Sequence, residues 1–170
     1  GSLDESSRVD TDTLVEMGTI FLTAGKTADA VTLFDRAVEQ DPDHAEAHFR
    51  RALGLLALGR PGEARAGFEK FLAEYPGSDL AGHSQYWLGE TYYVTQKYDQ
   101  ALAAFQKAVN QYPQSRKLPD ALLKVGYCRY ELGQYVEARA ALNTVLERFP
   151  ESTAARLAGQ RLDRMQSEGR

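Results

Sequence analysis

The chain has 170 residues, of which 43% are hydrophobic and 26% are charged, with a net charge of −4 and a single cysteine. This composition is typical of a folded protein with enough apolar residues to form a core. The negative charge argues against a general nucleic-acid binder. No apolar run reaches the roughly 20 residues that span a bilayer, so we expect no membrane insertion. The lone Cys128 excludes an internal disulfide and leaves the cellular compartment open.

The first ten residues are polar and charged, and the chain begins with Gly1-Ser2, which resembles a cloning scar. We therefore expect residues 1–10 to be a disordered tag or linker. What precedes residue 1 in the natural protein stays open.

A repeated pattern begins at residue 11 and runs through most of the chain. Each unit ends in a proline, preceded twelve residues earlier by an alanine, eight earlier by a large apolar residue and twenty-four earlier by a small residue. The prolines are Pro42, Pro76, Pro113 and Pro150, and the alanines are Ala30, Ala64, Ala101 and Ala138. The period is 34 residues at first and 37 afterwards. This is the pattern of tetratricopeptide (TPR) repeats, in which small residues let two antiparallel helices pack closely.

The pattern predicts an all-α fold: a right-handed TPR superhelix of four helix-turn-helix repeats, closed by a C-terminal capping helix. We expect one domain over residues 11–170, with repeats at 11–44, 45–81, 82–118 and 119–151 and the cap at 152–166. The predicted helices cover 12–24, 27–40, 45–58, 61–74, 79–95, 98–111, 118–132 and 135–148. In the cap, Ser152 can accept the first amide, and alanine, leucine and methionine side chains form one apolar strip.

From Ser84 onward the chain resembles one TPR family more narrowly. The motifs "YWLGETYY", "PDALLKVGY", "ELGQY" and "STAARLAGQRL" are similar to the C-terminal repeat domain of the Tol–Pal system protein, the cell division coordinator CpoB (YbgF). The resemblance implies a bacterial periplasmic protein that binds TolA and links outer-membrane constriction to septal wall synthesis, with a septal wall synthase as a further partner. It covers about the last half of the chain. Residues 11–44 look like a generic TPR unit, and the oligomeric state stays open.

The first helix of each repeat is expected to line the concave face of the superhelix. On a helical wheel, Tyr86, Trp87 and Tyr93 lie opposite Leu88 and Tyr92, so we expect the first three in a partner-binding groove and the other two in the core. The predicted groove residues are Phe49, Arg50, Leu53, Tyr86, Trp87, Glu90, Tyr93, Lys124, Tyr127 and Tyr130. Exposed aromatic residues of this kind mark interaction sites. The alternative is that these rings pack on one another and close the face.

The same positions argue against a carboxylate clamp. TPR modules that hold a C-terminal carboxylate use lysine, asparagine and arginine in the groove, whereas this chain has Val15, Thr19, Phe49 and Leu53 there. We expect the groove to prefer apolar or helical segments.

No catalytic or cofactor site is predicted. His44 and His48 stand four residues apart, as metal ligands on a helix can, but no third ligand has suitable spacing. Cys128 is interpreted as a small buried thiol rather than a nucleophile. We therefore expect no enzyme activity, no metal and no cofactor.

Two classes of function remain at this point. The first is a non-catalytic binding module, with TolA as the partner that the resemblance implies. The second is an accessory domain of a larger enzyme. A generic TPR adaptor or an envelope-assembly scaffold that binds an unrelated peptide segment is a further alternative to the TolA interpretation.

Overall fold

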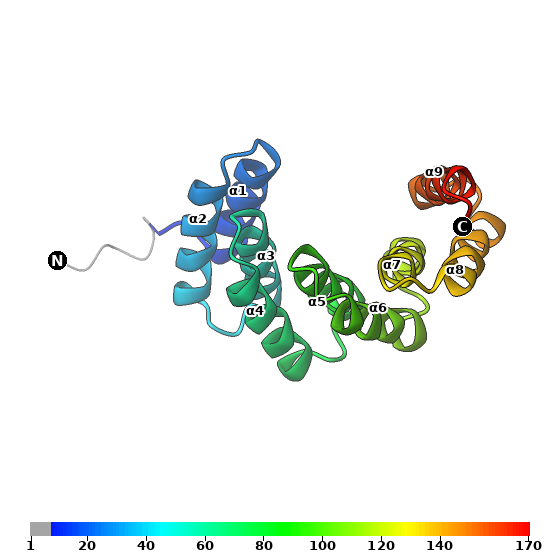
Figure 1. The fold of residues 1–170 in the computed structure, drawn as a ribbon. Coiled ribbons are helices and arrows are strands. Elements are labelled where there is room, and N and C mark those ends of the chain that lie inside the picture. Colours follow the sequence, from blue (N-terminus) through cyan, green and yellow to red (C-terminus); the bar gives the residue numbers. More distant parts are fainter. Residues whose placement is uncertain (1–7) are drawn as a thin grey trace. The chain divides into compact units, whose positions relative to one another are not determined.

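The computed structural model describes residues 8–170, and every regular element in that range is an α-helix. Figure 1 shows the helices in chain order. They are α1 (Thr11–Thr23), α2 (Thr27–Gln40), α3 (Ala45–Ala57), α4 (Pro61–Glu74), α5 (Ala81–Val94), α6 (Tyr98–Gln111), α7 (Leu118–Glu131), α8 (Tyr135–Arg148) and α9 (Thr153–Ser167). The predicted all-α repeat fold is confirmed, and α2, α4, α6 and α8 have the predicted bounds.

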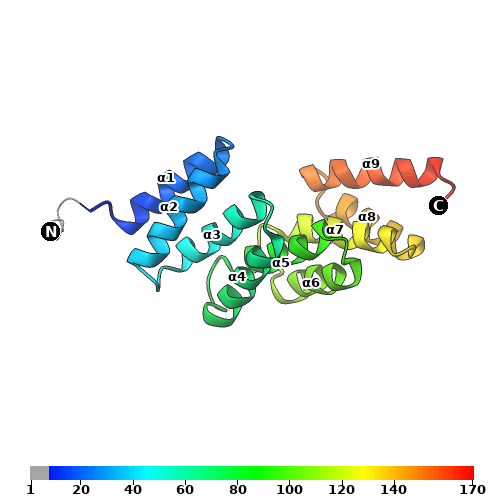
Figure 2. The same ribbon diagram turned by 60° about the vertical axis from the view of Figure 1, so that its left-hand side comes forward.

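The contacts divide the chain into two compact units, Gly1–Leu80 and Ala81–Arg170. Unit 1 contains α1 to α4 and unit 2 contains α5 to α9. Successive helices pair as α1 with α2, α3 with α4, α5 with α6 and α7 with α8, and each pair runs antiparallel (Figure 2). The division falls next to the predicted boundary between the second and third repeats, whereas the sequence predicts one continuous domain.

The repeated small residues lie where the two helices of a pair touch. A methyl group added at Gly89 would stand 2.6 Å from Phe105 Cε1, and one added at Gly126 would stand 2.7 Å from Leu142 Cδ2. The four repeated alanines of the second helices are all fully buried. The spacing of small and large residues in the sequence therefore records real helix–helix contacts.

Left-handed residues end the first helix of each pair. Gly59 has φ of 85°, and the next amide, that of Arg60, donates to the carbonyl of Leu55 at 2.9 Å. This geometry satisfies carbonyls at the end of the helix and suits glycine, which has no Cβ. At the equivalent place in the third repeat, Gln96 adopts a φ of 60° without being glycine.

The connections before α5 and α7 share one hydrogen-bonded turn. Ser78 N–H donates to Tyr75 O at 3.1 Å, and Leu80 N–H donates to Ser78 Oγ at 3.1 Å. In the later turn the amide of Ser115 donates to Tyr112 O, and that of Lys117 donates to Ser115 Oγ, both also at 3.1 Å. These turns supply two of the three residues by which the period lengthens, because each connection is two residues longer than the one between α2 and α3. The third comes from α5 and α7, which have 14 residues where α3 has 13.

Helix α9 packs on α7 and α8 as the predicted cap. Ser152 Oγ accepts the amide of Ala155 at 3.0 Å, and Met165 is fully buried. Leu157 and Leu162 are partly buried against the same cluster. The apolar strip read from the sequence is therefore the face that α9 buries.

The expected tag or linker covers residues 1–10, and residues 1–7 of it lie outside the described part of the chain. Next to it, Asp10 accepts the amide of Thr13 at 2.8 Å and caps α1. The carbonyl of Val9 accepts a hydrogen bond from Gln40 Nε2 at 3.0 Å.

Candidate protein-binding faces

Two of the predicted groove residues, Phe49 and Tyr86, point into the core and not toward a partner. Phe49 is 2% exposed and Tyr86 is 7% exposed, so the expectation that their rings are open to a partner is wrong. Phe49 packs on Phe68 and Phe71 with ring centroids 6.2 and 6.0 Å apart, and Tyr86 packs on Phe105 at 5.5 Å. The reason is helical spacing: each stands three residues before the small residue of its repeat, and residues i and i+3 share a face.

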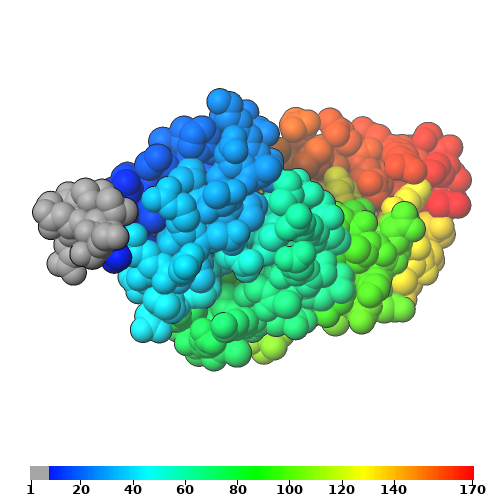
Figure 3. Space-filling view, turned by 90° about the vertical axis from the view of Figure 1, so that its left-hand side faces the viewer, coloured from blue at the N-terminus to red at the C-terminus, as the bar shows by residue number. Residues whose placement is uncertain are grey.

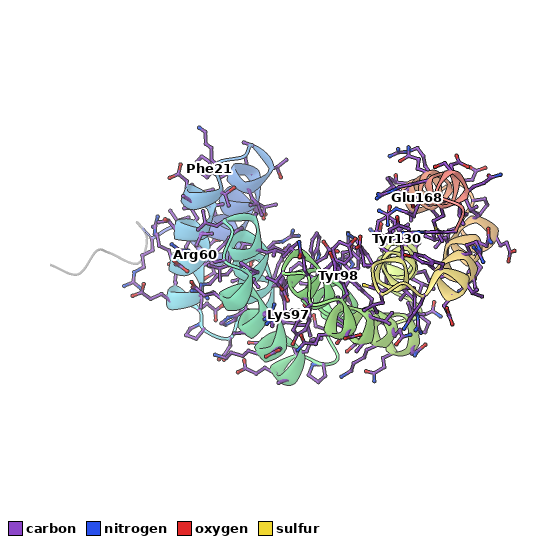
Figure 4. The ribbon with its side chains drawn as sticks, viewed as in Figure 1. Phe21, Arg60, Lys97, Tyr98, Tyr130 and Glu168 are labelled. Atoms are coloured by element: carbon purple, nitrogen blue, oxygen red, sulfur yellow. The ribbon has the colours of Figure 1, made fainter. Side chains whose placement is uncertain are left out.

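Tyr130 is also buried, for a different reason. Its exposed fraction is 6%, because α9 covers the face of α7 from which it projects. The Tyr130 hydroxyl donates to Glu168 Oε1 at 2.6 Å, and Figure 4 shows the two side chains at the α7–α9 contact. The expectation that the Tyr130 ring is open to a partner is therefore wrong.

Apart from Tyr93, the remaining predicted residues stand at two repeated positions that stay at least partly accessible. Arg50, Trp87 and Lys124 stand at one repeated position, and Leu53, Glu90 and Tyr127 stand three residues later in their helices. All six are half-buried, as is Tyr93. Each unit can be described separately, and their accessible faces differ in chemistry.

In unit 1, α1 and α3 border an open groove of about 620 Å³, here called the α1–α3 groove. Its lining residues are Asp12, Val15, Glu16, Thr19, Ile20, Glu46 and Arg50. Val15 and Thr19, which the sequence places at groove positions, line it together with Arg50, whereas Leu53 does not. The space-filling view shows one face of α1 to α4 in blue to green, with their side chains packed side by side (Figure 3).

In unit 2, lysine side chains lie over the aromatic rings of α5 and α7. Lys117 Nζ is 5.1 Å from the ring centroids of both Tyr86 and Trp87. Lys124 Nζ is 4.5 Å from the Tyr93 ring and forms an ion pair with Glu90 Oε1 at 2.8 Å. A cation over a ring face is attracted by the ring quadrupole, so these lysines hold the rings in place.

Arginines of α9 extend this arrangement over α7. The Arg161 guanidinium carbon lies 4.1 Å from the Tyr127 ring centroid and 4.9 Å from that of Tyr130. Arg164 lies 5.4 Å from the Tyr130 ring. We call the set Trp87, Tyr93, Lys117, Lys124, Tyr127 and Arg161 the cation–aromatic face of unit 2.

Burial governs the ionisation of the aromatic and thiol groups here. It raises the pKa of the Tyr86, Tyr93 and Tyr127 hydroxyls above the usual tyrosine range, with Arg161 opposing the shift at Tyr93 and Tyr127. Burial likewise raises the pKa of the Cys128 thiol to about 12, so the reactive thiolate is scarce at neutral pH. The geometry thus presents neutral hydroxyls beside fixed cations and no activated nucleophile at Cys128.

The two candidate metal ligands, His44 and His48, use their ring nitrogens in local contacts. His44 Nδ1 accepts the amide of Ala47 at 3.1 Å, which leaves Nε2 to donate to Asp12 Oδ1 at 2.7 Å. His48 Nε2 lies 2.6 Å from the carbonyl of Pro42. Within residues 8–170 no group of three His, Cys, Asp or Glu side chains is placed to hold a metal ion.

Several residues of these faces were missed in the sequence prediction. Ile20, Lys117 and Arg161 line the α1–α3 groove or the cation–aromatic face but were not predicted as binding residues. Ile20 stands four residues after Glu16, another lining residue, and this spacing indicates a shared helical face. Lys117 belongs to a turn, and Arg161 to the cap, so inspection of the first helices alone could not find them.

Comparisons with known proteins give the same repeat assignment. Residues 15–79 and residues 80–151 each match the tetratricopeptide repeat family. Residues of this chain are 39% identical over 64 positions to the mouse DnaJ homolog subfamily C member 3, across 38% of this chain and 13% of that protein. They are 37% identical over 60 positions to the tetratricopeptide repeat and J domain-containing co-chaperone DNJ1 of Fusarium oxysporum, across 35% of this chain and 12% of DNJ1. The chain therefore spans about an eighth of the length of the curated relatives it matches.

Among solved structures, MamA from Desulfovibrio magneticus RS-1 superposes with a TM-score of 0.71 at 26% identity, over 84% of this chain and 78% of MamA. PilF of Pseudomonas aeruginosa gives 0.75 at 20% identity, over 93% and 69%. YrrB, described as a TPR protein with an unusual peptide-binding site, gives 0.66 at 23% identity, over 86% and 72%. Below 25% identity such likeness shows the fold alone.

None of the helices in residues 8–170 combines the length and hydropathy that a membrane span requires. The helix pairs, the small residues at their contacts and the two repeat matches agree over residues 15–151. The chain belongs to the tetratricopeptide repeat family.

Proposed function

We propose that the chain is a non-catalytic protein–protein interaction module. The main support for this proposal is that the first helices of the repeats present two accessible surfaces. These are the open α1–α3 groove in unit 1 and the cation–aromatic face in unit 2. Half-buried tyrosine and tryptophan rings held by lysines are suited to protein contacts, because they bury a large area at little cost in side-chain entropy. Cys128, by contrast, lies buried with a raised pKa.

The partner we propose is a TolA-type protein of the bacterial envelope, bound in the periplasm. The chain would then coordinate outer-membrane constriction with septal wall synthesis during cell division. Support comes from the motifs that resemble the CpoB family, since "YWLGETYY" forms part of α5 and "PDALLKVGY" part of α7. These two helices supply Trp87, Tyr93, Lys124 and Tyr127, which belong to the cation–aromatic face.

A second candidate is an adaptor that binds an unrelated peptide segment. Unit 1 favours it, because α1 to α4 carry their own groove and lie outside the quoted motifs. The described peptide-binding site of YrrB and the co-chaperone name of DNJ1 are compatible with that role. The accessory domain of a larger enzyme would use the same surfaces.

Binding to a purified TolA fragment tests the first candidate. Trp87→Ala should weaken binding at least tenfold while changing the melting temperature little, because the half-buried ring leaves no large cavity. Tyr112→Ala, at the end of α6, is the matched control and should bind like the parent.

If the parent chain does not bind the fragment, TolA is not the partner, and a pull-down from an envelope extract then tests the second candidate. If Trp87→Ala binds like the parent, the partner does not use the cation–aromatic face.

A further inference from the structure

The α1–α3 groove has an aliphatic wall that its own unit does not cover. Val15 lies at the bottom with 3% of its surface exposed, whereas Ile20 is 68% exposed. Ile20 stands four residues after Glu16 and shares its side of α1, and both side chains line the groove. An isoleucine left this open inside a concave groove is a place where a partner side chain can bury apolar surface.

The polar rim of the groove is mainly acidic. Asp12, Glu16 and Glu46 contribute three carboxylates, and Arg50 contributes the one guanidinium among the lining residues. Arg50 Nε lies 3.4 Å from Glu46 Oε1, so that cation is already paired. Asp12 contacts His44 but keeps 82% of its side chain exposed. Glu16 forms no ion pair with any residue in the described part of the chain.

The charge of the whole unit has the same sign. Residues 1–80 contain 15 Asp and Glu against 8 Lys and Arg, whereas residues 81–170 contain 9 against 12. The acidic rim therefore lies within an acidic unit, and the field there attracts cations and repels anionic segments.

Resting on the proposed function, we infer that the α1–α3 groove selects a cationic segment of a protein partner, in which an aliphatic side chain stands beside a lysine or arginine. The aliphatic group covers Ile20, and the cation lies between Glu16 and Asp12. A groove of about 620 Å³ accommodates several side chains of one helical turn or extended segment.

Three synthetic peptides of about 15 residues, roughly one helix long, test this by fluorescence anisotropy with the full chain. One carries leucines along one face and lysines on the other, the second replaces the lysines with glutamates, and the third replaces the leucines with serines. The leucine–lysine peptide should bind at least about tenfold more tightly than either of the others. Equal binding of the glutamate peptide would overturn the inference.

Variants of the chain locate the site. Glu16→Lys and Ile20→Ser should each weaken the leucine–lysine peptide about tenfold, since one reverses a charge at the contact and the other removes the apolar wall. Glu39→Lys makes the same change in net charge on the exposed side of α2 and should stay within about twofold of the parent. Circular dichroism checks that all three variants keep the parent helicity.

Each other result counts against the inference. Unchanged binding by Glu16→Lys, or an equal loss in Glu39→Lys, would show that the α1–α3 groove does not select the peptide. If the chain binds the TolA fragment and none of the peptides, the proposed function stands and this inference fails. If it binds the leucine–lysine peptide and not the fragment, the inference stands without TolA.

Discussion

Lys124 of α7 and Glu90 of α5 form an ion pair of 2.8 Å with only 18% and 13% of their side chains exposed. Lys124 also lies over the Tyr93 ring, so its charge is stabilised from two directions. The pair is held by charge rather than by a well-aligned hydrogen bond, because the buried Glu90 Oε1 accepts none from the described residues. The ion pair connects α5 and α7, the first helices of two successive repeats, through their side chains.

Replacing either residue of this ion pair alone should lower the free energy of unfolding more than replacing both together. Lys124→Met leaves Glu90 as an uncompensated charge in a poorly hydrated place, and we expect a loss of about 1–3 kcal/mol in the free energy of unfolding. Adding Glu90→Leu should restore at least half of that loss. Urea denaturation of the parent, both single variants and the double variant measures the coupling. Strictly additive losses would show that the two charges do not interact.

Two glycines should respond in opposite ways to the same substitution. Gly89→Ala places a methyl group 2.6 Å from Phe105 Cε1, so we expect a loss of about 1–3 kcal/mol in the stability of unit 2. Gly159→Ala places one in open space within α9 and should stabilise the helix by about 0.5–1 kcal/mol. Thermal and urea unfolding compare both with the parent. If Gly89→Ala is as stable as the parent, the close contact of α5 and α6 is wrong.

Cys128 should resist thiol reagents while the chain is folded. Burial raises its pKa to about 12, and the side chain is fully buried, so reaction at pH 8 requires local or global opening. We expect labelling by a disulfide reagent to be at least 100-fold slower than for a cysteine placed at the exposed Ala103 in a Cys128→Ala background, which is roughly the effect of 2.7 kcal/mol of opening free energy.

The same thiol predicts a pH dependence. A free thiol ionises near pH 8.5, so between about 8.5 and 12 the unfolded chain gives up this proton before the folded chain does. The contribution of Cys128 to stability is therefore complete below pH 8.5 and is lost as the pH rises. Cys128→Ala should show a shallower decline in alkaline melting temperature than the parent. Identical declines would contradict the predicted shift.

The contribution of the Tyr130–Glu168 hydrogen bond to the melting temperature should depend on pH in the acid range. Donation by the Tyr130 hydroxyl lowers the pKa of Glu168. The hydrogen bond therefore contributes to the free energy of unfolding above the ordinary carboxyl pKa, and this contribution is lost as the pH falls through the lowered pKa of Glu168. Tyr130→Phe should therefore melt below the parent at pH 7 and differ much less at pH 2.5. A difference in melting temperature that is the same at both pH values would assign the effect to packing.

The sequence predicts the helices well because each boundary has a local chemical cause. Pro61 begins α4, and Ser152 caps α9 with the expected contact. Helix α5 begins two residues later than predicted, since Ser78 forms a turn with Leu80 that periodicity does not reveal. Every other helix end lies within one residue of its predicted place, because repeat spacing and local propensity act on each of them.

The candidate faces were less predictable because they depend on contacts between distant residues. Opposition on a helical wheel placed Tyr86 away from Leu88, but the contact of α5 with Phe105 of α6 decided its burial. Arg161 of α9 is not among the predicted groove residues, and it nevertheless stacks on Tyr127 of the preceding repeat. A wheel gives the direction of a side chain, whereas the neighbour that it meets depends on how repeats pack.

The matching turns at Ser78 and Ser115 bear on how such a chain can grow. The segment 76–112 starts inside one turn and ends at the start of the other, and each turn closes with the same two hydrogen bonds. A tandem duplication of that segment would join Tyr112 to a second Pro76 and recreate the turn at the new junction. Unequal recombination at this point could thus insert a whole helix pair without inventing a linker.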